Sequence, residues 1–350
     1  MSKNESSPSR LVKQTKKRKL RKRIYFILIP FLIAFIGFGY FISLYIKAES
    51  TVSDSYEDDG REKSDLRDSK VDPTEDNVSI LIIGVDENNH RDNAGDSRSD
   101  ALLLATLNKK DKSVKLLSIP RDSKVFIPEV GYEDKITHAH AFGGPQATIE
   151  TVENLLDIPV DYFVKLNFHA FVDVVNAIDG ITVDVPYEFW ESDSNDKKNS
   201  IHLLPGEQLL DGEEALALAR TRKLDNDIER GKRQMDIIKS VAKKATSVSS
   251  VMKLDDVIEA VGDNMTTNLS FNEMKSFLSY ATSGSNLDID SMTLEGHDHQ
   301  PANVYYWQLD ELALNETKQT LQTHLEIIED KDANTGSVNA LQNESESDSY

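Results

Sequence analysis

The chain has 350 residues, no cysteine and a net charge of −20. Without cysteine, a disulfide framework, thiolate catalysis and cysteine-ligated zinc are excluded. The first 23 residues carry a net charge of +9, which leaves −29 for the remainder, so a basic arm precedes an acidic body. Such an arm would suit nucleic-acid binding or the cytoplasmic side of a membrane anchor.

The segment after the basic arm favours a membrane anchor. Residues 24 to 46 carry no charge, are rich in Ile, Leu and Phe, and as a helix would span roughly 35 Å, more than a hydrocarbon core of about 30 Å. Because positive residues stay cytoplasmic, we expect a single-pass signal-anchor in the cell membrane, with arm 1–23 inside and the remainder extracellular. Nucleic acid is then not an expected partner.

The composition divides the remainder into three parts. Residues 47 to 77 consist mostly of Asp, Glu, Ser and Lys, and are predicted to form a flexible acidic stalk. Residues 330 to 350 have the same character and are predicted to be disordered. Residues 78 to 329 lie between them and are numerous enough for one well-buried domain.

The domain opens with two signals of a sheet. Residues 78 to 85 are almost wholly apolar and end at Asp86, as expected of a buried central strand. Residues 101–107 and 113–119 are strand-like and separated by five polar residues, which predicts a hairpin. If the first strand runs in the direction of residues 113–119, Asp86 emerges at the edge where the hairpin begins and ends.

That edge gathers charged side chains. In an antiparallel hairpin the start of one strand lies beside the end of the other, so Arg98 and Asp100 are expected close to Arg121 and Asp122. Ligands of α/β sheets bind outside strand ends, which makes this edge a candidate site. The alternative is a set of surface ion pairs that contribute little.

Two further segments leave alternatives open. Residues 135 to 145 are predicted to form a loop before a helix at 146–156; Lys135 would either reach an anionic ligand or be solvated, and His138 and His140 alternate like zinc ligands without an evident third ligand. A helix at 168–178 follows a strand at 160–167. Its apolar stripe is interpreted as core, with a lipid pocket as the alternative; the stripe comprises Phe168, Phe171, Val172, Val175 and Ile178.

Positive charge is concentrated between residues 220 and 234. Arg220 and Arg222 would point to one side of an extended backbone, and Asp227, Arg230 and Gln234 would share one face of a helix at 227–244. Guanidinium groups bind phosphate oxygens in two places at once, and a nearby carboxylate can hold Mg²⁺, so this pattern suits a pyrophosphate site. A solvated helix capped by Asp227 is the plainer alternative. Further helices are predicted near residues 251–261, 272–281 and 308–329.

These motifs, in this order and spacing over residues 78 to 244, resemble the LytR-CpsA-Psr family, whose members are anchored in Gram-positive membranes. The segments that carry the resemblance are Ile83-Gly84-Val85-Asp86, Arg98-Ser99-Asp100, Ser118-Ile119-Pro120-Arg121-Asp122, Lys135-Ile136-Thr137-His138-Ala139, Gly143-Gly144-Pro145, and Arg220-Thr221-Arg222-Lys223 with Asp227, Arg230, Arg233 and Gln234.

The resemblance implies a three-layer α/β/α sandwich around a mixed sheet. It also implies a Mg²⁺-dependent phosphotransferase that moves an anionic glycopolymer, such as teichoic acid, from undecaprenyl pyrophosphate to peptidoglycan. By position, Asp86 and Asp100 would lie on the metal side and Asp227 would be a possible base. The implied pyrophosphate clamp comprises Arg98, Arg121, Arg220, Arg222 and Arg230, supported by Lys135 and Gln234, with Arg121, Arg220, Arg222 and Asp227 as the catalytic set.

Two alternative functions stay open. A prenyl pyrophosphate hydrolase would need the same clamp and would differ in using water as the acceptor. A non-enzymatic, membrane-anchored regulator of cell-envelope gene expression would have to read DNA through the basic arm, which contains no helix-turn-helix motif.

Overall fold

The computed structural model describes residues 49–50, 53, 55–85, 98–223, 227–245, 264–282 and 288–328. Residues 1–49 and residues 50–350 form two separate compact units, and the elements below belong to the second. The predicted arm, anchor and C-terminal tail lie outside the described residues. Within the described ranges, no helix is long and apolar enough to cross a membrane.

The second unit is an α/β domain built on a mixed six-stranded sheet with the order β11-β6-β1-β2-β3-β12. The central strand β1 (Val78–Val85) pairs antiparallel with β2 (Ser99–Asn108) and parallel with β6 (Tyr162–Asn167). The predicted hairpin is confirmed, because β2 pairs antiparallel with β3 (Ser113–Ser118). Strands β1 and β3 therefore run in the same direction. The sheet is completed by β12 (Asp288–Thr293), parallel to β3, and β11 (Met265–Thr267), antiparallel to β6.

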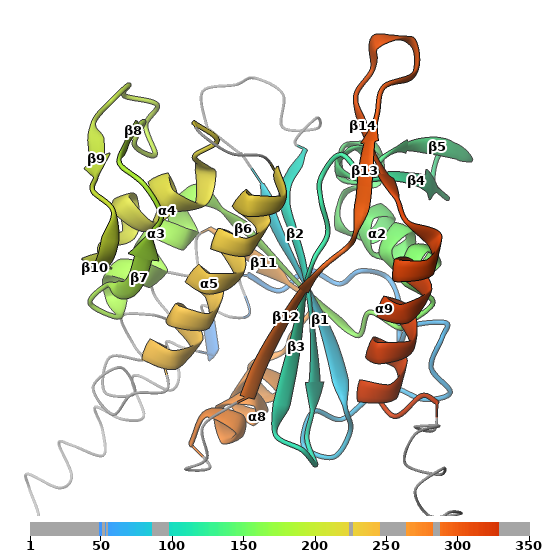
Figure 1. Ribbon diagram of the computed structural model, residues 1–350. Helices are drawn as coiled ribbons and strands as arrows, with labels where there is room; N and C mark the ends of the chain where they lie inside the picture. Colours follow the sequence, from blue (N-terminus) through green and yellow to red (C-terminus); the bar gives the residue numbers. More distant parts are fainter. Residues whose placement is uncertain are drawn as a thin grey trace, which may run out of the picture. The chain divides into compact units, whose positions relative to one another are not determined.

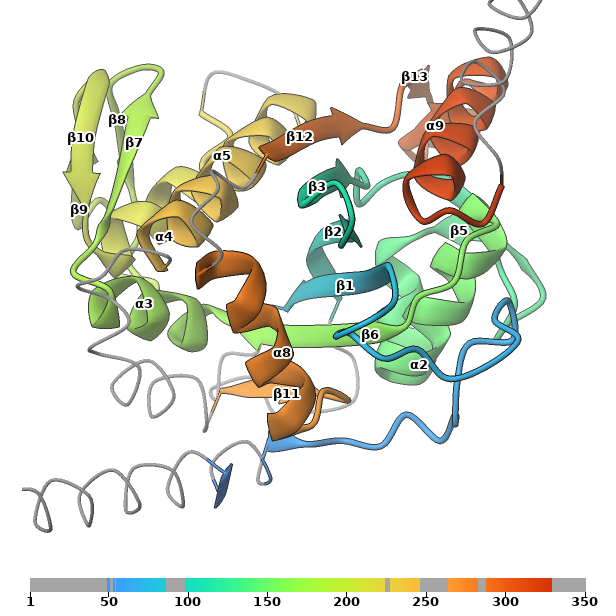
Figure 2. The same ribbon diagram turned by 90° about the horizontal axis from the view of Figure 1, so that it is seen from below.

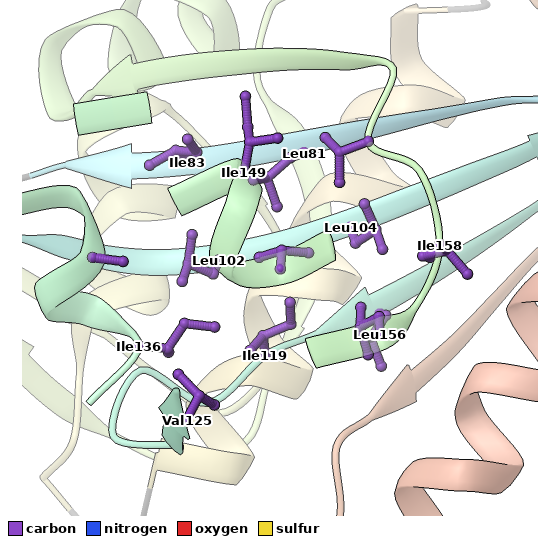
Figure 3. Packing of buried hydrophobic residues seen from close by; sticks show 14 of the residues in the cluster. Leu81, Ile83, Leu102, Leu104, Ile119, Val125, Ile136, Ile149, Leu156 and Ile158 are labelled. Atoms are coloured by element: carbon purple, nitrogen blue, oxygen red, sulfur yellow. The ribbon is translucent and has the colours of Figure 1, made fainter. Parts of the chain in front are cut away.

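Helices cover both faces of this sheet because apolar side chains of its strands point to alternate sides. Leu81 and Ile83 face a core shared with α2 (Thr137–Leu156) and α9 (Glu311–His324); Figure 3 shows this core at close range. On the opposite face, Ile80 and Ile82 pack with α5 (Asp227–Ala245) and α8 (Phe271–Thr282). Figures 1 and 2 show the two groups of helices on either side of the sheet.

A third core lies beside the sheet, between two helices and a two-stranded sheet. The helices are α3 (Phe168–Ala177) and α4 (Gly212–Arg220), and the strands are β7 (Ile181–Val185) and β10 (Gly206–Leu210). This group adjoins α5, so its helices approach the edge of the sheet at which β1 ends and β2 begins. The other small hairpins are β4 (Lys124–Ile127) with β5 (Tyr132–Lys135), β8 (Phe189–Glu191) with β9 (Ile201–Leu203), and β13 (Gly296–His299) with β14 (Tyr306–Leu309), the last enclosing a 3₁₀ turn η1 (Pro301–Asn303).

Two helices begin at residues other than those predicted. Helix α2 begins at Thr137 rather than at residue 146, so most of the predicted loop is helical. It breaks at Gly143 and Gly144, where Gly144 has φ 64° and ψ −150°, a conformation that favours glycine. Pro145 cannot donate a hydrogen bond and restricts the residue before it, so the helix restarts there. Helix α9 begins at Glu311 rather than at residue 308, because the Asp310 carboxylate caps it. The helix predicted at 251–261 lies outside the described residues.

Residues 57 to 77 were expected to form part of a flexible stalk, but charged contacts attach them to the domain. The Glu57 N–H donates to the Thr267 carbonyl at 2.9 Å. Arg61 forms an ion pair with Glu153 at 3.1 Å, and Arg67 forms one with the buried Asp161 at 2.7 Å. Because ion pairs contribute to this attachment, besides the packing of Val71 against a core, the composition of the segment resembles that of a free linker.

Candidate functional site

A cavity of about 330 Å³ lies between the sheet and helices α3, α4 and α5. One part of its wall is apolar and the other carries charged and amide groups. The apolar part comprises Ile82, Leu103, Leu166, Phe168, Phe171, Leu216, Ile237 and Ile238; the polar part comprises Asp100, Arg121, Asn167, Arg220, Arg222, Arg230 and Gln234.

The two parts follow from positions along the strands. Asp100 lies at the start of β2 and Arg121 follows β3, which places both at the predicted sheet edge. Ile82 and Leu103 are register partners farther along the strands. Gly84 pairs with Ala101 between this apolar pair and the charged edge, and a Cβ added at Gly84 would lie 3.1 Å from the Ala101 Cβ. The small side chains thus keep open a path from the charged edge to the apolar part.

An ion pair confirms that the hairpin brings its ends together. The Arg121 guanidinium donates through Nη1 to Asp100 Oδ1, and both side chains are partly buried. Arg121 Nε is buried and has no hydrogen-bond partner within the described part of the chain. Arg230, 6% exposed, donates from Nη2 to the backbone carbonyl of Asp100 at 3.3 Å. Two guanidinium groups from separate elements therefore meet one carboxylate-bearing residue.

Arg220 and Arg222 reach the cavity from the end of α4. This helix starts with a capping box between Asp211 and Glu214 and ends at Arg220. Thr221 is extended (φ −59°, ψ 139°) and buried, and both arginines line the cavity. Both arginines thus reach one cavity, as predicted, although Arg220 still belongs to the helix and not to an extended segment.

Arg220 is held loosely on the cavity wall. Its guanidinium lies 4.6 Å from the Phe168 ring centroid, a cation–π distance. Its Nη1 donates to the Asp193 carbonyl at 3.4 Å and its Nη2 to Asp196 Oδ1 at 3.5 Å, both long contacts.

Helix α5 supplies the opposite wall. Arg230 and Gln234 both line the cavity, as their predicted common face requires, and Gln234 Nε2 donates to the Ala219 carbonyl at 3.2 Å. Gly231 allows α5 to approach the sheet, because a Cβ there would lie 2.5 Å from Ser118 Oγ.

Arg233, which was not predicted as a site residue, supports the site from α5. Its side chain is 7% exposed and donates to the carbonyls of Leu218 and Thr221 at 3.2 Å and 2.5 Å. These bonds satisfy carbonyls at the end of α4 and so fix the start of the Arg220–Arg222 segment. The spacing of Arg233 and Ile237, four residues apart on one buried face, was the available signal.

Four predicted site residues are not placed in the cavity wall. Lys135, at the end of β5, forms an ion pair with Asp122 at 2.7 Å and does not line the cavity. Arg98 is exposed and does not line the cavity. Asp86 lies outside the described residues, as does the side chain of Asp227, although Asp227 begins α5 as predicted.

The apolar stripe of α3 was predicted to be core, with the wall of a lipid pocket as the alternative, and the structure divides it between core and cavity wall. Phe168 and Phe171, in its first turn, line the cavity. Val175 and Ile178, farther along, are buried in the third core. Helical periodicity places these apolar residues on one face of α3. Which part of this face is core and which part is cavity wall depends on the packing of β6, α4 and α5 against it.

The described residues contain no group of three or more His, Cys, Asp or Glu able to hold a metal. His138 contacts Asp134 at 2.8 Å and His140 is buried. Asp100 nevertheless places one carboxylate in the cavity wall. Mg²⁺ is usually held by one or two carboxylates together with substrate phosphate oxygens, so Asp100 fits as one protein ligand of such an ion.

The fold and the cavity define an α/β domain able to receive an amphiphile with an anionic end, because guanidinium groups adjoin an apolar wall. Residues 42–323 match the LytR_cpsA_psr family model, and the chain belongs to this family. It is 40% identical over 320 residues to the polyisoprenyl-teichoic acid–peptidoglycan teichoic acid transferase TagT of Bacillus subtilis strain 168, covering 90% of this chain and 98% of the relative.

Solved structures agree with this assignment. The structure of TagT bound to LI-WTA matches with a TM-score of 0.64 and 42% identity. The structure of the LytR-CPS2A-psr family protein YwtF (TagT) with bound octaprenyl pyrophosphate lipid matches with a TM-score of 0.60 and 39% identity. Each match covers 76% of this chain and 97% of the solved chain.

Proposed function

We propose that this protein is a transferase that moves a teichoic acid or related anionic glycopolymer from a polyisoprenyl pyrophosphate carrier to peptidoglycan. The observation that carries the proposal is a single cavity in which Arg121, Arg220, Arg222 and Arg230 adjoin an apolar wall. The guanidinium groups suit a pyrophosphate and the apolar wall suits a prenyl chain. The names of the relatives support the same substrates, and we propose undecaprenyl as the carrier chain.

The reaction transfers a phosphoryl group. A peptidoglycan hydroxyl attacks the phosphorus that carries the polymer, the bond from this phosphorus to the bridging oxygen breaks, and prenyl monophosphate leaves. The hydroxyl proton passes to a carboxylate, for which Asp227 at the start of α5 is our candidate. Arginines that neutralise the equatorial and bridging oxygens favour the transition state, so a serine or cysteine nucleophile is not required.

We further propose that Mg²⁺ takes part, with Asp100 as one ligand and Asp86 as a second. Bound Mg²⁺ would neutralise charge on the phosphate oxygens. Asp100 itself orients Arg121 through their ion pair. This pairing gives Asp100 a role in the site whether or not the cation is bound.

The location of the substrates supports an anchored enzyme. A prenyl carrier is confined to the membrane, and the uncharged run at residues 24–46 would keep the domain near it. We therefore propose a cytoplasmic N-terminus and an extracellular domain. Residues 57–77 are attached to the domain by Arg61 and Arg67.

The test uses the full chain in detergent, prenyl-pyrophosphate-linked polymer, Mg²⁺ and peptidoglycan, with covalent attachment of polymer to peptidoglycan as the readout. Arg121→Ala and Arg222→Ala are expected to abolish turnover. Lys109→Ala removes an exposed cation on the β2–β3 turn, away from the cavity; it is the control and is expected to retain turnover. If polymer is released to water at the same rate with and without peptidoglycan, the hydrolase alternative is favoured. Retained attachment with either arginine variant would refute the clamp.

A further inference from the structure

A second cluster of chemistry-bearing side chains lies next to the cavity, around the turn that follows β3. Asp122 directly follows the cavity residue Arg121, and its carboxylate pairs with Lys135 at 2.7 Å. The Lys135 Nζ lies 5.9 Å and 5.8 Å from the ring centroids of Tyr305 and Tyr306. The cluster thus contains two aromatic rings, a carboxylate and an ammonium group. Its carboxylate belongs to the residue that directly follows Arg121 of the proposed phosphate site.

The β13–β14 hairpin, which carries the tyrosines, is fixed to the turn that follows β3. The Trp307 N–H donates to the Asp122 carbonyl at 2.8 Å, and Trp307 forms an isolated parallel bridge with Ser123. The indole of Trp307 donates in turn to the Leu294 carbonyl at 3.3 Å. Figure 1 shows the β13–β14 hairpin projecting beyond the sheet beside β4 and β5. The rings are therefore held at a set position relative to Arg121.

The outer part of this cluster is exposed and pre-ordered. Tyr305 is 37% exposed, and its hydroxyl donates to Asp298 Oδ1 at 2.9 Å, which restrains the ring. Val304, the preceding residue, is 46% exposed. Tyrosine offers a large contact surface at low cost in conformational entropy, with a polar edge for hydrogen bonding.

On this basis we propose that Tyr305 and Tyr306, together with Asp122 and Lys135, form the subsite for the sugar backbone of the acceptor glycan; this inference rests on the proposed transferase function. The C–H faces of pyranose rings pack on aromatic rings, and sugar hydroxyls accept from ammonium groups and donate to carboxylates. The place of the subsite next to Arg121 would bring an acceptor hydroxyl to the phosphorus.

The charge of the cluster distinguishes the acceptor from the other substrates. Asp122 pairs with Lys135, Glu133 on the adjoining β5 pairs with Lys124, and Asp298 adds a further carboxylate, so these groups carry no excess of positive charge. Groups without an excess of positive charge do not attract a polyanionic donor polymer or an anionic lipid surface, whereas their carboxylates can bind sugar hydroxyls. The cluster therefore fits a glycan better than the anionic polymer or the membrane.

The test compares substrate dependences in the full-chain transfer assay. Tyr305→Ala, and the double variant with Tyr306→Ala, are expected to raise the peptidoglycan concentration for half-maximal rate at least about fivefold. The donor concentration for half-maximal rate should stay within about twofold. Tyr305→Phe, which keeps the ring, should have a peptidoglycan concentration for half-maximal rate close to that of the wild type. Tyr132→Ala removes another exposed tyrosine, on β5, that contacts Phe142 instead, and serves as the matched control.

Each outcome has a distinct meaning. If the double variant needs the same peptidoglycan concentration for half-maximal rate as the wild type, the acceptor subsite is overturned. If the half-maximal concentrations of donor and peptidoglycan rise equally, the tyrosines contact the donor polymer, which also overturns the acceptor subsite. If the double variant fails to fold, the exposed single variant Tyr305→Ala decides by the same two measurements. Failure of the wild-type chain to attach polymer at all would instead refute the proposed function on which the subsite rests.

Discussion

His324, the last residue of α9, is expected to make the stability of the domain depend on pH. Its side chain is 8% exposed and lies on the β2–β3 hairpin, with Nδ1 2.8 Å from Thr106 Oγ1 and Nε2 2.9 Å from Ser113 Oγ. Its backbone carbonyl accepts from Asn108 Nδ2 at 2.8 Å. Burial, followed by the nearby positive charge of Lys115, lowers the pKa of His324 from 6.5 to about 4.

The lowered pKa sets the sign and size of the effect. Above pH 6.5 the imidazole is neutral in both states, so it imposes no penalty. As the pH falls below 6.5, the unfolded chain binds a proton that the folded chain binds only near pH 4, and stability is lost across that window. At about 1.36 kcal/mol per pKa unit, the loss is about 2 kcal/mol between pH 7 and pH 5 and approaches about 3 kcal/mol at pH 4.

The measurement is urea unfolding of residues 50–350, followed by tryptophan fluorescence, between pH 7 and pH 5. His324→Gln keeps hydrogen-bonding groups at this position and removes the titration, so its free energy of unfolding should fall by about 2 kcal/mol less than that of the wild type over this interval. Carboxylates titrate in both proteins and cancel in the comparison. Parallel pH dependences would refute the buried, neutral state of His324.

Three further predictions concern packing, attachment and the cation. Gly231→Ala should destabilise the domain by about 1–3 kcal/mol, because its Cβ would lie 2.5 Å from Ser118 Oγ, and adding Ser118→Ala should recover most of the loss; additive losses in denaturant unfolding would contradict this reasoning. Arg67→Ala should cost about 3 kcal/mol by leaving the buried Asp161 unpaired, and an unchanged unfolding midpoint would show that residues 57–77 do not contribute to the fold. Chelation of Mg²⁺ should stop transfer, and Asp100→Asn should raise the Mg²⁺ requirement about tenfold; turnover that persists in excess chelator would rule the cation out.

The convergence of Asp100 and Arg121 could be predicted from the sequence because it depends on local topology. A five-residue connection between two strand-like runs leaves few arrangements other than a hairpin, and a hairpin brings its ends together. The common face of Arg230 and Gln234 is predictable for the same kind of reason, since helical spacing fixes it. Both predictions rest on contacts within one element or between adjacent ones.

Other features depend on contacts that are distant in the sequence. Lys135 is the last residue of β5, and the β4–β5 hairpin directs it to Asp122 and not to the cavity. The attachment of Arg61 and Arg67 involves partners about ninety residues away. Charged side chains give no periodic signal of such pairing, so composition alone suggests a free stalk where the structure has a bound segment.

The arginines of the cluster differ in how firmly each is committed to the fold, and this difference separates support from substrate binding. Arg233 is buried and donates to two carbonyls at the end of α4 over distances as short as 2.5 Å, so re-aiming it would leave these carbonyls unsatisfied at a cost of about 1–3 kcal/mol each. Arg220 contacts its polar partners at 3.4 Å and 3.5 Å on the cavity wall, and it would lose little by turning to a phosphate. Arg233→Lys should therefore lower stability more than affinity for the donor, whereas Arg220→Lys should do the reverse, because an ammonium group lacks the guanidinium's two-point contact with phosphate. Donor titrations and unfolding curves of the two variants would test this division, and equal losses in both measurements would refute it.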